Sequence, residues 1–121
     1  MAQIRTFRDL IVWQKSYELA LGIYHVTKDF PQEEKFILAS QIKRAAISVA
    51  SNIVEGFRRR TIKDSLNFYN IAESSLEELK YQLILSLDLG FIAQEQFNEI
   101  NSKAQEVGRT LRGWIKSNSQ K

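Results

Sequence analysis

The spacing of the apolar residues constrains this chain more than any other feature of its sequence. Apolar side chains recur three or four positions apart through most of the 121 residues, as along one side of an α-helix, rather than alternating as in a half-buried β-strand. Pro31, Gly56 and Gly90 separate the helical stretches. The pattern predicts four helices, over residues 8–29, 32–59, 62–89 and 94–117. Four helices with short connections favour an all-α fold, an up-down-up-down antiparallel four-helix bundle forming one domain over residues 1–121.

Capping signals locate the starts of three of these helices. Thr6 precedes Asp9 by three residues, and Thr61 precedes Asp64 by the same spacing, which is the capping-box pattern at a helix N-terminus. Pro31 suits the first turn of the second helix, because the amide donor that proline lacks has no partner there anyway. The first helix is therefore expected to begin near residue 8 and the second at residue 32.

Each helix is expected to turn one apolar stripe towards the core. The stripe of the first helix comprises Leu10, Trp13, Tyr17, Ala20, Leu21 and Tyr24. Those of the second and third helices comprise Leu38, Ile42, Ala45, Ala46, Val49 and Ile53, and then Leu66, Tyr69, Ala72, Leu76, Leu79, Leu83 and Leu87. The stripe of the fourth comprises Phe97, Ile100, Ala104, Val107, Leu111 and Trp114.

Three of the helices carry further apolar residues away from these stripes. A bundle helix in a monomer needs only one apolar stripe, so the excess indicates either a surface for self-association or a core wide enough to bury both faces. We take self-association, and hence a homo-oligomer, as the working hypothesis. The residues expected at its interface are Val12, Leu19, Ile23 and Val26 of the first helix, Phe36, Ile47 and Val54 of the second, and Ile71, Leu85 and Leu89 of the third.

The composition offers no recognisable catalytic or metal-binding apparatus. The chain has no cysteine and a single histidine, His25, with no carboxylate at the Glu-x-x-His spacing of di-iron bundles. No phosphate-binding loop or nucleophile elbow occurs. We therefore expect no enzyme activity, no cofactor and no metal. The absence of any apolar run long enough for a membrane span, of a signal-peptide pattern and of cysteine predicts a cytoplasmic protein without a membrane partner.

Two polar residues, Asn52 and Glu55, are expected near the core-facing side of the second helix. Buried polar groups require partners, so these side chains indicate a structural network, with Ser48, Ser75 or Tyr69 as candidate partners. A polar functional pocket is the alternative interpretation.

The charges are distributed unevenly along the chain, although the net charge is only +3. Residues 35–63 carry seven bases and one acid, whereas residues 64–106 carry two bases and eight acids. In an antiparallel bundle the C-terminal ends of the second and fourth helices meet at one pole, so their bases could form one patch for nucleic-acid phosphates. Helix-end electrostatics is the competing explanation. The candidate binding residues are Lys43, Arg44, Arg58, Arg59, Arg60, Lys63, Arg109, Arg112 and Lys116.

Several motifs resemble those of one bacterial family. They are Phe7, Asp9, Leu10, Trp13 and Gln14; Phe30-Pro31 with Glu34; Gln41 to Ala46 with Ser48; Ser51 to Gly56; and Ile71-Ala72 with Ser75-Leu76 and Glu78-Leu79. Together they resemble the four-helix bundle proteins encoded in intervening sequences of 23S ribosomal RNA genes, often called the S23 ribosomal protein family. The likeness covers nearly the whole chain.

The resemblance implies a small antiparallel bundle that assembles into a barrel-shaped homopentamer. A relative of the family, the accessory variability protein of diversity-generating retroelements, binds nucleic acid and a reverse transcriptase through a basic pentamer. Together with the charge pattern, this implies a non-enzymatic homo-oligomer that binds RNA or DNA backbones without strong sequence preference. The alternative is a scaffold or adaptor for a protein partner such as a reverse transcriptase.

Overall fold

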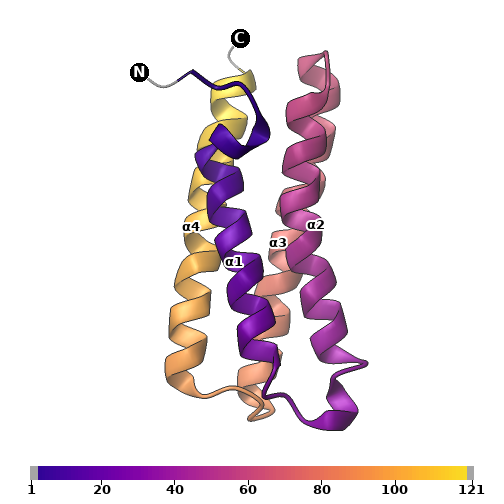
Figure 1. The fold of residues 1–121 in the computed structure, drawn as a ribbon, viewed down its shortest axis with the longest axis vertical. Helices are drawn as coiled ribbons and strands as arrows, with labels where there is room; N and C mark the ends of the chain where they lie inside the picture. The colour runs from indigo at the N-terminus through magenta and orange to yellow at the C-terminus, as the bar shows by residue number, and fades with distance from the viewer. Residues whose placement is uncertain (1–2, 120–121) are drawn as a thin grey trace.

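The fold is an antiparallel four-helix bundle, as the sequence predicts (Figure 1). The computed structural model describes residues 3–119. The four α-helices are α1 (Ile11–Thr27), α2 (Leu38–Arg58), α3 (Ile62–Asp88) and α4 (Gln94–Ser119). Two 3-10 helices, η1 (Phe7–Asp9) and η2 (Gln32–Glu34), precede α1 and α2. Successive helices run in opposite directions, so the chain segment before α1, the α2–α3 turn and the end of α4 lie at one pole.

The first two helices begin later than predicted. The Thr6–Asp9 capping box is present, with the amides of Arg5 and Thr6 donating to Asp9 Oδ2 at 2.8 and 3.0 Å, but it caps the N-terminus of η1 instead of that of α1. Leu10 is extended and separates η1 from α1. After Pro31, η2 lasts for three residues, and a non-helical Ile37 delays α2 until Leu38. The bounds of α3 and α4 lie within two residues of the predicted ones.

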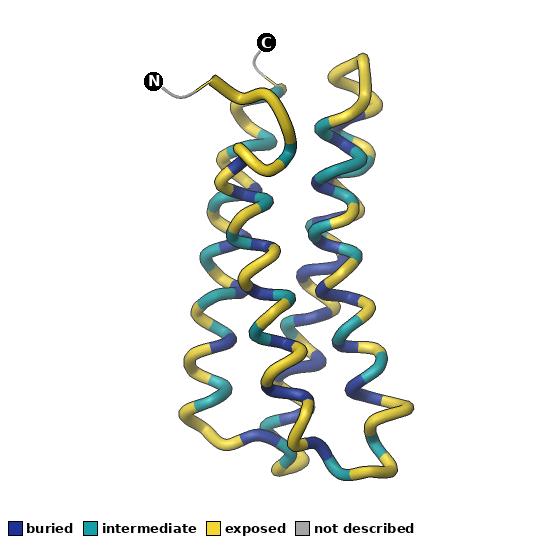
Figure 2. Tube along the Cα trace, viewed as in Figure 1, coloured by how far each residue is buried: buried dark blue, intermediate teal, exposed yellow. Residues whose placement is uncertain are grey.

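The bundle core follows the expected stripes of three helices (Figure 2). All six stripe residues of α2 are buried. In α3 and α4 the stripe residues nearest the middle of each helix are buried, and those nearest the helix ends are partly exposed. The buried members of these last two stripes are Tyr69, Ala72, Leu76, Leu79 and Leu83 of α3, and Ile100, Ala104, Val107 and Leu111 of α4.

The sequence-based assignment of the two faces of the first helix is wrong for most of its residues, although Leu10 is buried and Trp13 and Ala20 pack against the core. Val12, Leu19 and Ile23, expected at an oligomer interface, are at most 3% exposed and lie in the core with Val26. Three residues expected in the core lie at the surface: Tyr17, Leu21 and Tyr24 are 44–55% exposed. Both sides of this helix are apolar, so spacing alone does not select the inner one. The aliphatic side packs inside, where a tyrosine hydroxyl would need a buried partner.

The remaining residues expected at an interface lie at or near the surface. Phe36 is 84% exposed, Ile47, Ile71, Leu85 and Leu89 are 40–53% exposed, and Val54 is half-buried. Their exposure is what a self-association surface requires. No helix in the described part of the chain is long and apolar enough to cross a membrane.

Close packing joins α2 to α3 at the pole where they meet. A Cβ atom at Gly56 would overlap the ring of Tyr69, so only glycine lets the two helices approach this closely. Ser65 Oγ donates to the Gly56 carbonyl oxygen at 2.7 Å, and the Thr61 hydroxyl caps α3 by accepting from the Asp64 amide. These contacts hold the three-residue connection 59–61 in one place.

Candidate nucleic-acid interface

One pole of the bundle gathers most of the basic side chains. Three separate segments meet there: residues 3–10, the α2–α3 connection with its flanking turns, and the last three turns of α4. We define the basic pole by its nine bases, Arg5, Arg8, Arg58, Arg59, Arg60, Lys63, Arg109, Arg112 and Lys116. The acids in the same segments are Asp9, Glu55 and Asp64.

The opposite pole has the opposite charge. It consists of the α1–α2 connection, the α3–α4 connection and the adjoining helix ends, within residues 28–37 and 85–99. We define this acidic pole by six acids, Asp29, Glu33, Glu34, Asp88, Glu95 and Glu99, against the two bases Lys28 and Lys35. The bundle is therefore electrically polarised along its long axis.

Helix-end electrostatics accounts for part of the basic pole only. Cations are favoured at helix C-termini, which fits the bases at the ends of α2 and α4. Lys63 instead lies in the first turn of α3, and Arg5 and Arg8 precede the start of α1. A helix N-terminus disfavours a cation, so these three bases need another explanation. The positions of these three bases therefore distinguish the two explanations, because helix-end electrostatics does not account for them.

Arg59 differs from the neighbouring bases because its side chain makes contacts with other residues of the bundle. Its guanidinium pairs with Glu55 Oε1, donates from Nε to the Glu55 carbonyl oxygen at 3.1 Å, and stands 4.5 Å from the centre of the Phe68 ring. Among the described residues it is the only base of the basic pole in an ion pair. Arg58, Arg60 and Lys63 around it are exposed.

Two of the sequence-predicted binding residues lie away from the pole. Lys43 and Arg44 belong to the first turns of α2, about 20 Å along the helix from Arg58 at 1.5 Å per residue. The Lys43 ammonium instead stands 5.1 Å from the centre of the Tyr24 ring. The structure also adds Arg5 and Arg8, which lie beside the ends of α2 and α4. Sequence reasoning missed them because it selected bases by their density near those helix ends, although the predicted antiparallel order already places the chain start at that pole.

The predicted polar network is present at Asn52 and excludes Glu55. Asn52 Nδ2 donates to the carbonyl oxygen and hydroxyl of Ser48 at 2.8 and 3.1 Å, and the Ser48 hydroxyl lies 2.7 Å from that of Ser75 on α3. The Glu55 side chain is 45% exposed and pairs with Arg59, so it is a surface residue. Tyr69 takes no part, and burial raises the pKa of its phenol.

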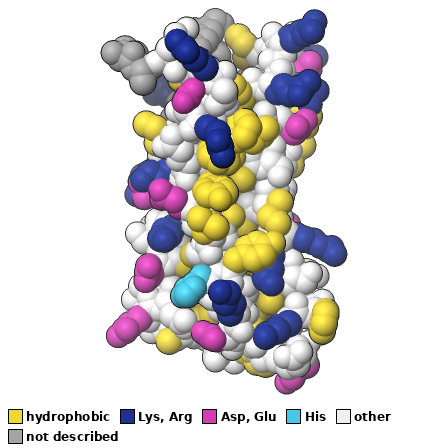
Figure 3. Space-filling view, in the orientation of Figure 1, with side chains coloured by type: hydrophobic (Ala, Val, Ile, Leu, Met, Phe, Trp, Pro, Cys, Tyr) yellow, Lys and Arg dark blue, Asp and Glu magenta, His cyan; other side chains and the backbone are white. Residues whose placement is uncertain are grey.

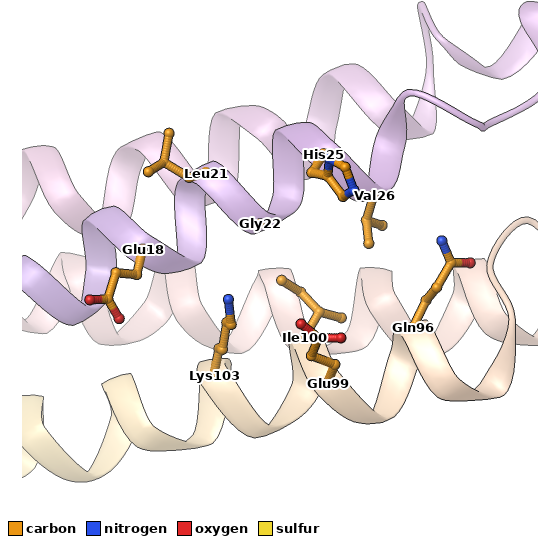
Figure 4. Close-up of a pocket in the computed structure, with 9 residues that line it drawn as sticks. All are labelled: Glu18, Leu21, Gly22, His25, Val26, Gln96, Glu99, Ile100 and Lys103. Carbon is orange, nitrogen blue, oxygen red and sulfur yellow. The ribbon is translucent and has the colours of Figure 1, made fainter.

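A groove of about 450 Å³ lies between α1 and α4 (Figure 4). Glu18, His25, Glu99 and Lys103 surround it, and Gly22 lets α1 approach Ile100. No three potential metal ligands of the described residues gather there or anywhere else.

A nearby ion pair joins the same two helices, α1 and α4. Lys15 Nζ lies 3.0 Å from Glu106 Oε1 across the α1–α4 contact, and the hydrogen bond to Glu106 raises the pKa of Lys15. The pair lies next to the groove, because Lys15 precedes the lining residue Glu18 by three positions of α1 and Glu106 follows Lys103 by three positions of α4.

The fold and its charges define a four-helix bundle with one basic pole and one acidic pole. The family model of the 23S rRNA-intervening sequence proteins matches residues 8–113, so the chain belongs to this family. A search of the curated proteins finds no match. Among solved structures, the chain is similar to a protein of unknown function from the S23 ribosomal protein family of Bacteroides thetaiotaomicron VPI-5482. The TM-score is 0.81 and the sequence identity 33%, over 88% of this chain and 96% of the other. The resemblance inferred from the motifs is confirmed.

Proposed function

We propose that the protein is a non-enzymatic bundle that self-associates and binds RNA or DNA backbones through its basic pole, without strong sequence preference. The observation that carries the proposal is the presence of Arg5, Arg8 and Lys63 beside helix N-termini, where helix electrostatics disfavours cations. Exposed cations that the fold does not need are suited to phosphates. The contacts would go to the backbone, which carries no sequence information directly.

Two unlike apolar faces support self-association. One lies between α1 and α2, where Figure 3 shows hydrophobic side chains in a stripe down the front, and it includes Tyr17, Tyr24 and Ile47 beside Lys43. The other lies on α3, where Leu85 and Leu89 are exposed next to acids. Contacts between unlike faces are heterologous, and they close into a ring when the rotation between copies permits it.

A closed ring would place every basic pole on one rim. Cyclic symmetry gives every subunit the same inclination to the ring axis, so the modest patch of each subunit repeats at the same height around the ring and adds to the others as avidity. The family resemblance favours five subunits. A ring is therefore expected to bind a long polyanion more tightly than a short one.

The assembly is tested by light scattering on variants that place a like charge, which repels, against the partner face. Ile47→Glu would set a carboxylate against the acidic α3 face, and Leu85→Arg would set a cation against the Lys43 face. Each should dissociate the assembly while helicity stays largely intact, and Ser102→Glu on the exposed side of α4 is the control. A wild-type particle of 14.0 kDa at micromolar concentration would refute self-association.

Binding is tested by titrating long RNA and DNA over a range of salt concentrations. Arg58→Gln with Arg60→Gln removes two exposed cations of the basic pole, and Lys28→Gln with Lys35→Gln removes two exposed cations of the acidic pole as a matched control. The first variant should bind unrelated sequences more weakly, and the slope of log K against log salt should fall by about one unit for each phosphate that it no longer neutralises. Equal binding by both variants, or no wild-type binding at about 50 mM salt, would contradict the proposal.

A second candidate function is that of an adaptor for a protein partner such as a reverse transcriptase. Phe36, 84% exposed, and Ile37, 59% exposed, stand together at the acidic pole and favour this alternative. Such an apolar contact should change little with salt, whereas phosphate binding should weaken steeply. Phe36→Ala would reduce the affinity for the protein partner and leave nucleic-acid binding unchanged.

A further inference from the structure

Gly113 is a helical glycine with open space around it, and neither packing nor backbone conformation explains it. A Cβ at Gly22, Gly56 or Gly108 would come within 3.3 Å of another side chain, and Gly90 has a left-handed φ of 78°. A Cβ at Gly113 would meet nothing within 4 Å. Glycine inside a helix lowers helix stability relative to alanine, so α4 includes a costly residue with no structural benefit to the fold.

The missing side chain keeps a groove open at the basic pole. This groove, which we call the pole groove, has a volume of about 540 Å³ and lies between the chain segment before α1, the first turn of α1 and the end of α4. Its wall is mostly apolar, with three polar side chains among the lining residues. The residues that line it are Ile4, Asp9, Leu10, Ile11, Val12, Thr110, Gly113, Trp114 and Ser117.

The charges in and around the pole groove define its occupant. Asp9 is the only charged lining residue, and hydrogen bonds from the Arg5 and Thr6 amides lower the pKa of its carboxyl, so it remains an anion at neutral pH. A phosphate is therefore disfavoured inside. Outside, Arg5 adjoins Ile4 in the chain, Arg109 precedes Gly113 by one helical turn, and Lys116 adjoins Ser117. The surroundings attract an anionic backbone, and the interior accepts an uncharged, largely apolar group.

We propose that the pole groove binds an unpaired nucleobase of a single strand whose phosphates lie on the basic pole. The inference rests on the proposed nucleic-acid function and adds the class of ligand. A nucleobase is a flat group with an apolar face and polar edges, which suits a groove with the Trp114 indole on its wall and Asp9, Thr110 and Ser117 as hydrogen-bonding groups. A duplex base reaches such a groove only by leaving the stack, which costs free energy. Single strands should therefore bind more tightly than duplexes.

The test uses the glycine itself. Gly113→Leu would place a side chain in the groove without a clash at Cβ, and Gly113→Ala is the conservative control. Binding of an unstructured 20-nucleotide RNA and of a duplex of equal length is measured by fluorescence anisotropy. The wild-type protein and Gly113→Ala should prefer the single strand, and Gly113→Leu should lose about tenfold in affinity for it while its affinity for the duplex is unchanged. If Gly113→Leu fails to fold, Ser117→Leu narrows the groove from a neighbouring position on the same helix.

Tryptophan fluorescence gives an independent readout. In a Trp13→Phe background Trp114 is the only tryptophan, and a single strand should quench its emission more than a duplex does. Three results would overturn the inference. In the first, single strands and duplexes bind equally and Gly113→Leu has no effect, which leaves the proposed function standing. In the second, Gly113→Leu lowers the mass of the assembly, which assigns the groove to a second copy. In the third, no nucleic acid binds at all, which refutes the proposed function as well.

Discussion

The two poles of the bundle are closed by different chemistry. At the basic pole the connection 59–61 is short, and hydrogen bonds to backbone carbonyl oxygens hold it: Arg59 Nε donates to that of Glu55, and the Ser65 hydroxyl donates to that of Gly56. At the acidic pole the longer connection 28–37 is anchored by an aromatic pair, Phe30 and Phe91, whose ring centres lie 5.5 Å apart.

Because of this difference, the basic pole has exposed side chains that the fold does not use, and the acidic pole has fewer of them. The acidic pole buries Phe30 and Ile92 beneath its connections, so its loops contribute to the core. The basic pole needs few side chains to close its short turn, and its remaining cations project into solvent. A pole closed by local polar contacts can present charge to a ligand without weakening the core. We therefore expect core substitutions to be most damaging at the acidic pole and charge substitutions to affect binding most at the basic pole.

The largest expected effect tests the acidic pole. Phe30→Ala should lower the free energy of unfolding by about 3–5 kcal/mol, because it deletes a ring that is 3% exposed and leaves a cavity beside Phe91. Phe36→Ala, six residues along the same connection, should change it by less than about 0.5 kcal/mol, because that ring is 84% exposed. Urea denaturation of the two variants measures both values. Equal costs would mean that Phe36 is buried in the protein as it exists in solution, as an oligomer contact would require.

The second prediction tests the junction at the basic pole. Gly56→Ala should destabilise the protein by about 1–3 kcal/mol, because its methyl group would overlap the Tyr69 ring and force α2 and α3 apart. In a Tyr69→Leu background the same substitution should cost less, because the smaller side chain leaves room. Thermal melts of the double-mutant cycle provide the measurement. Additive effects would show that the clash with Tyr69 is not what restricts this position to glycine.

Sequence reasoning located the buried faces of α2, α3 and α4, and in α2 and α4 it did so because the two sides of the helix differ clearly in polarity. In α2 the stripe from Leu38 to Ile53 is flanked by Gln41, Arg44 and Ser51, so the periodicity indicates which side of the helix is buried. In α1 both sides are apolar, and the choice depends on how well Leu19 and Ile23 fill the space in the core. Periodicity carries no information on that fit.

Sequence reasoning identified only part of the candidate site, because it selected bases by their density along the chain. Charge density along the chain identified Arg58, Arg60 and Lys63, which are near neighbours in sequence. Arg5 and Arg8 join them only because antiparallel packing brings distant segments to one pole. The significance of Gly113 depends on knowing that no side chain stands near it, which requires coordinates.

The third prediction concerns the α2–α3 contact between the poles. Asn52→Ala should cost about 1 kcal/mol, because it removes the donor to the Ser48 carbonyl and hydroxyl beside Ser75. Glu55→Ala should cost no more than about 0.5 kcal/mol, because its exposed ion pair with Arg59 is screened by solvent. Chemical denaturation distinguishes the two residues that sequence reasoning had grouped together. A larger loss at Glu55 would mean that the turn at the basic pole depends on its charge.

The smallest expected effect is also the one with the opposite sign. Gly113→Ala should stabilise the protein by about 0.5–1 kcal/mol, because alanine restricts the unfolded chain and favours the helix while its methyl group meets no neighbour in the folded state. Gly22→Ala, where the methyl group would lie 2.7 Å from Ile100 Cδ1, should show no such gain. Melting temperatures of the two variants at equal protein concentration provide the comparison. A gain at Gly113 would show that the open groove at the basic pole is maintained at a cost to stability, as expected of a position that serves binding. A loss would mean that α4 needs glycine there for the fold itself, which would remove the first argument for the pole groove as a binding site.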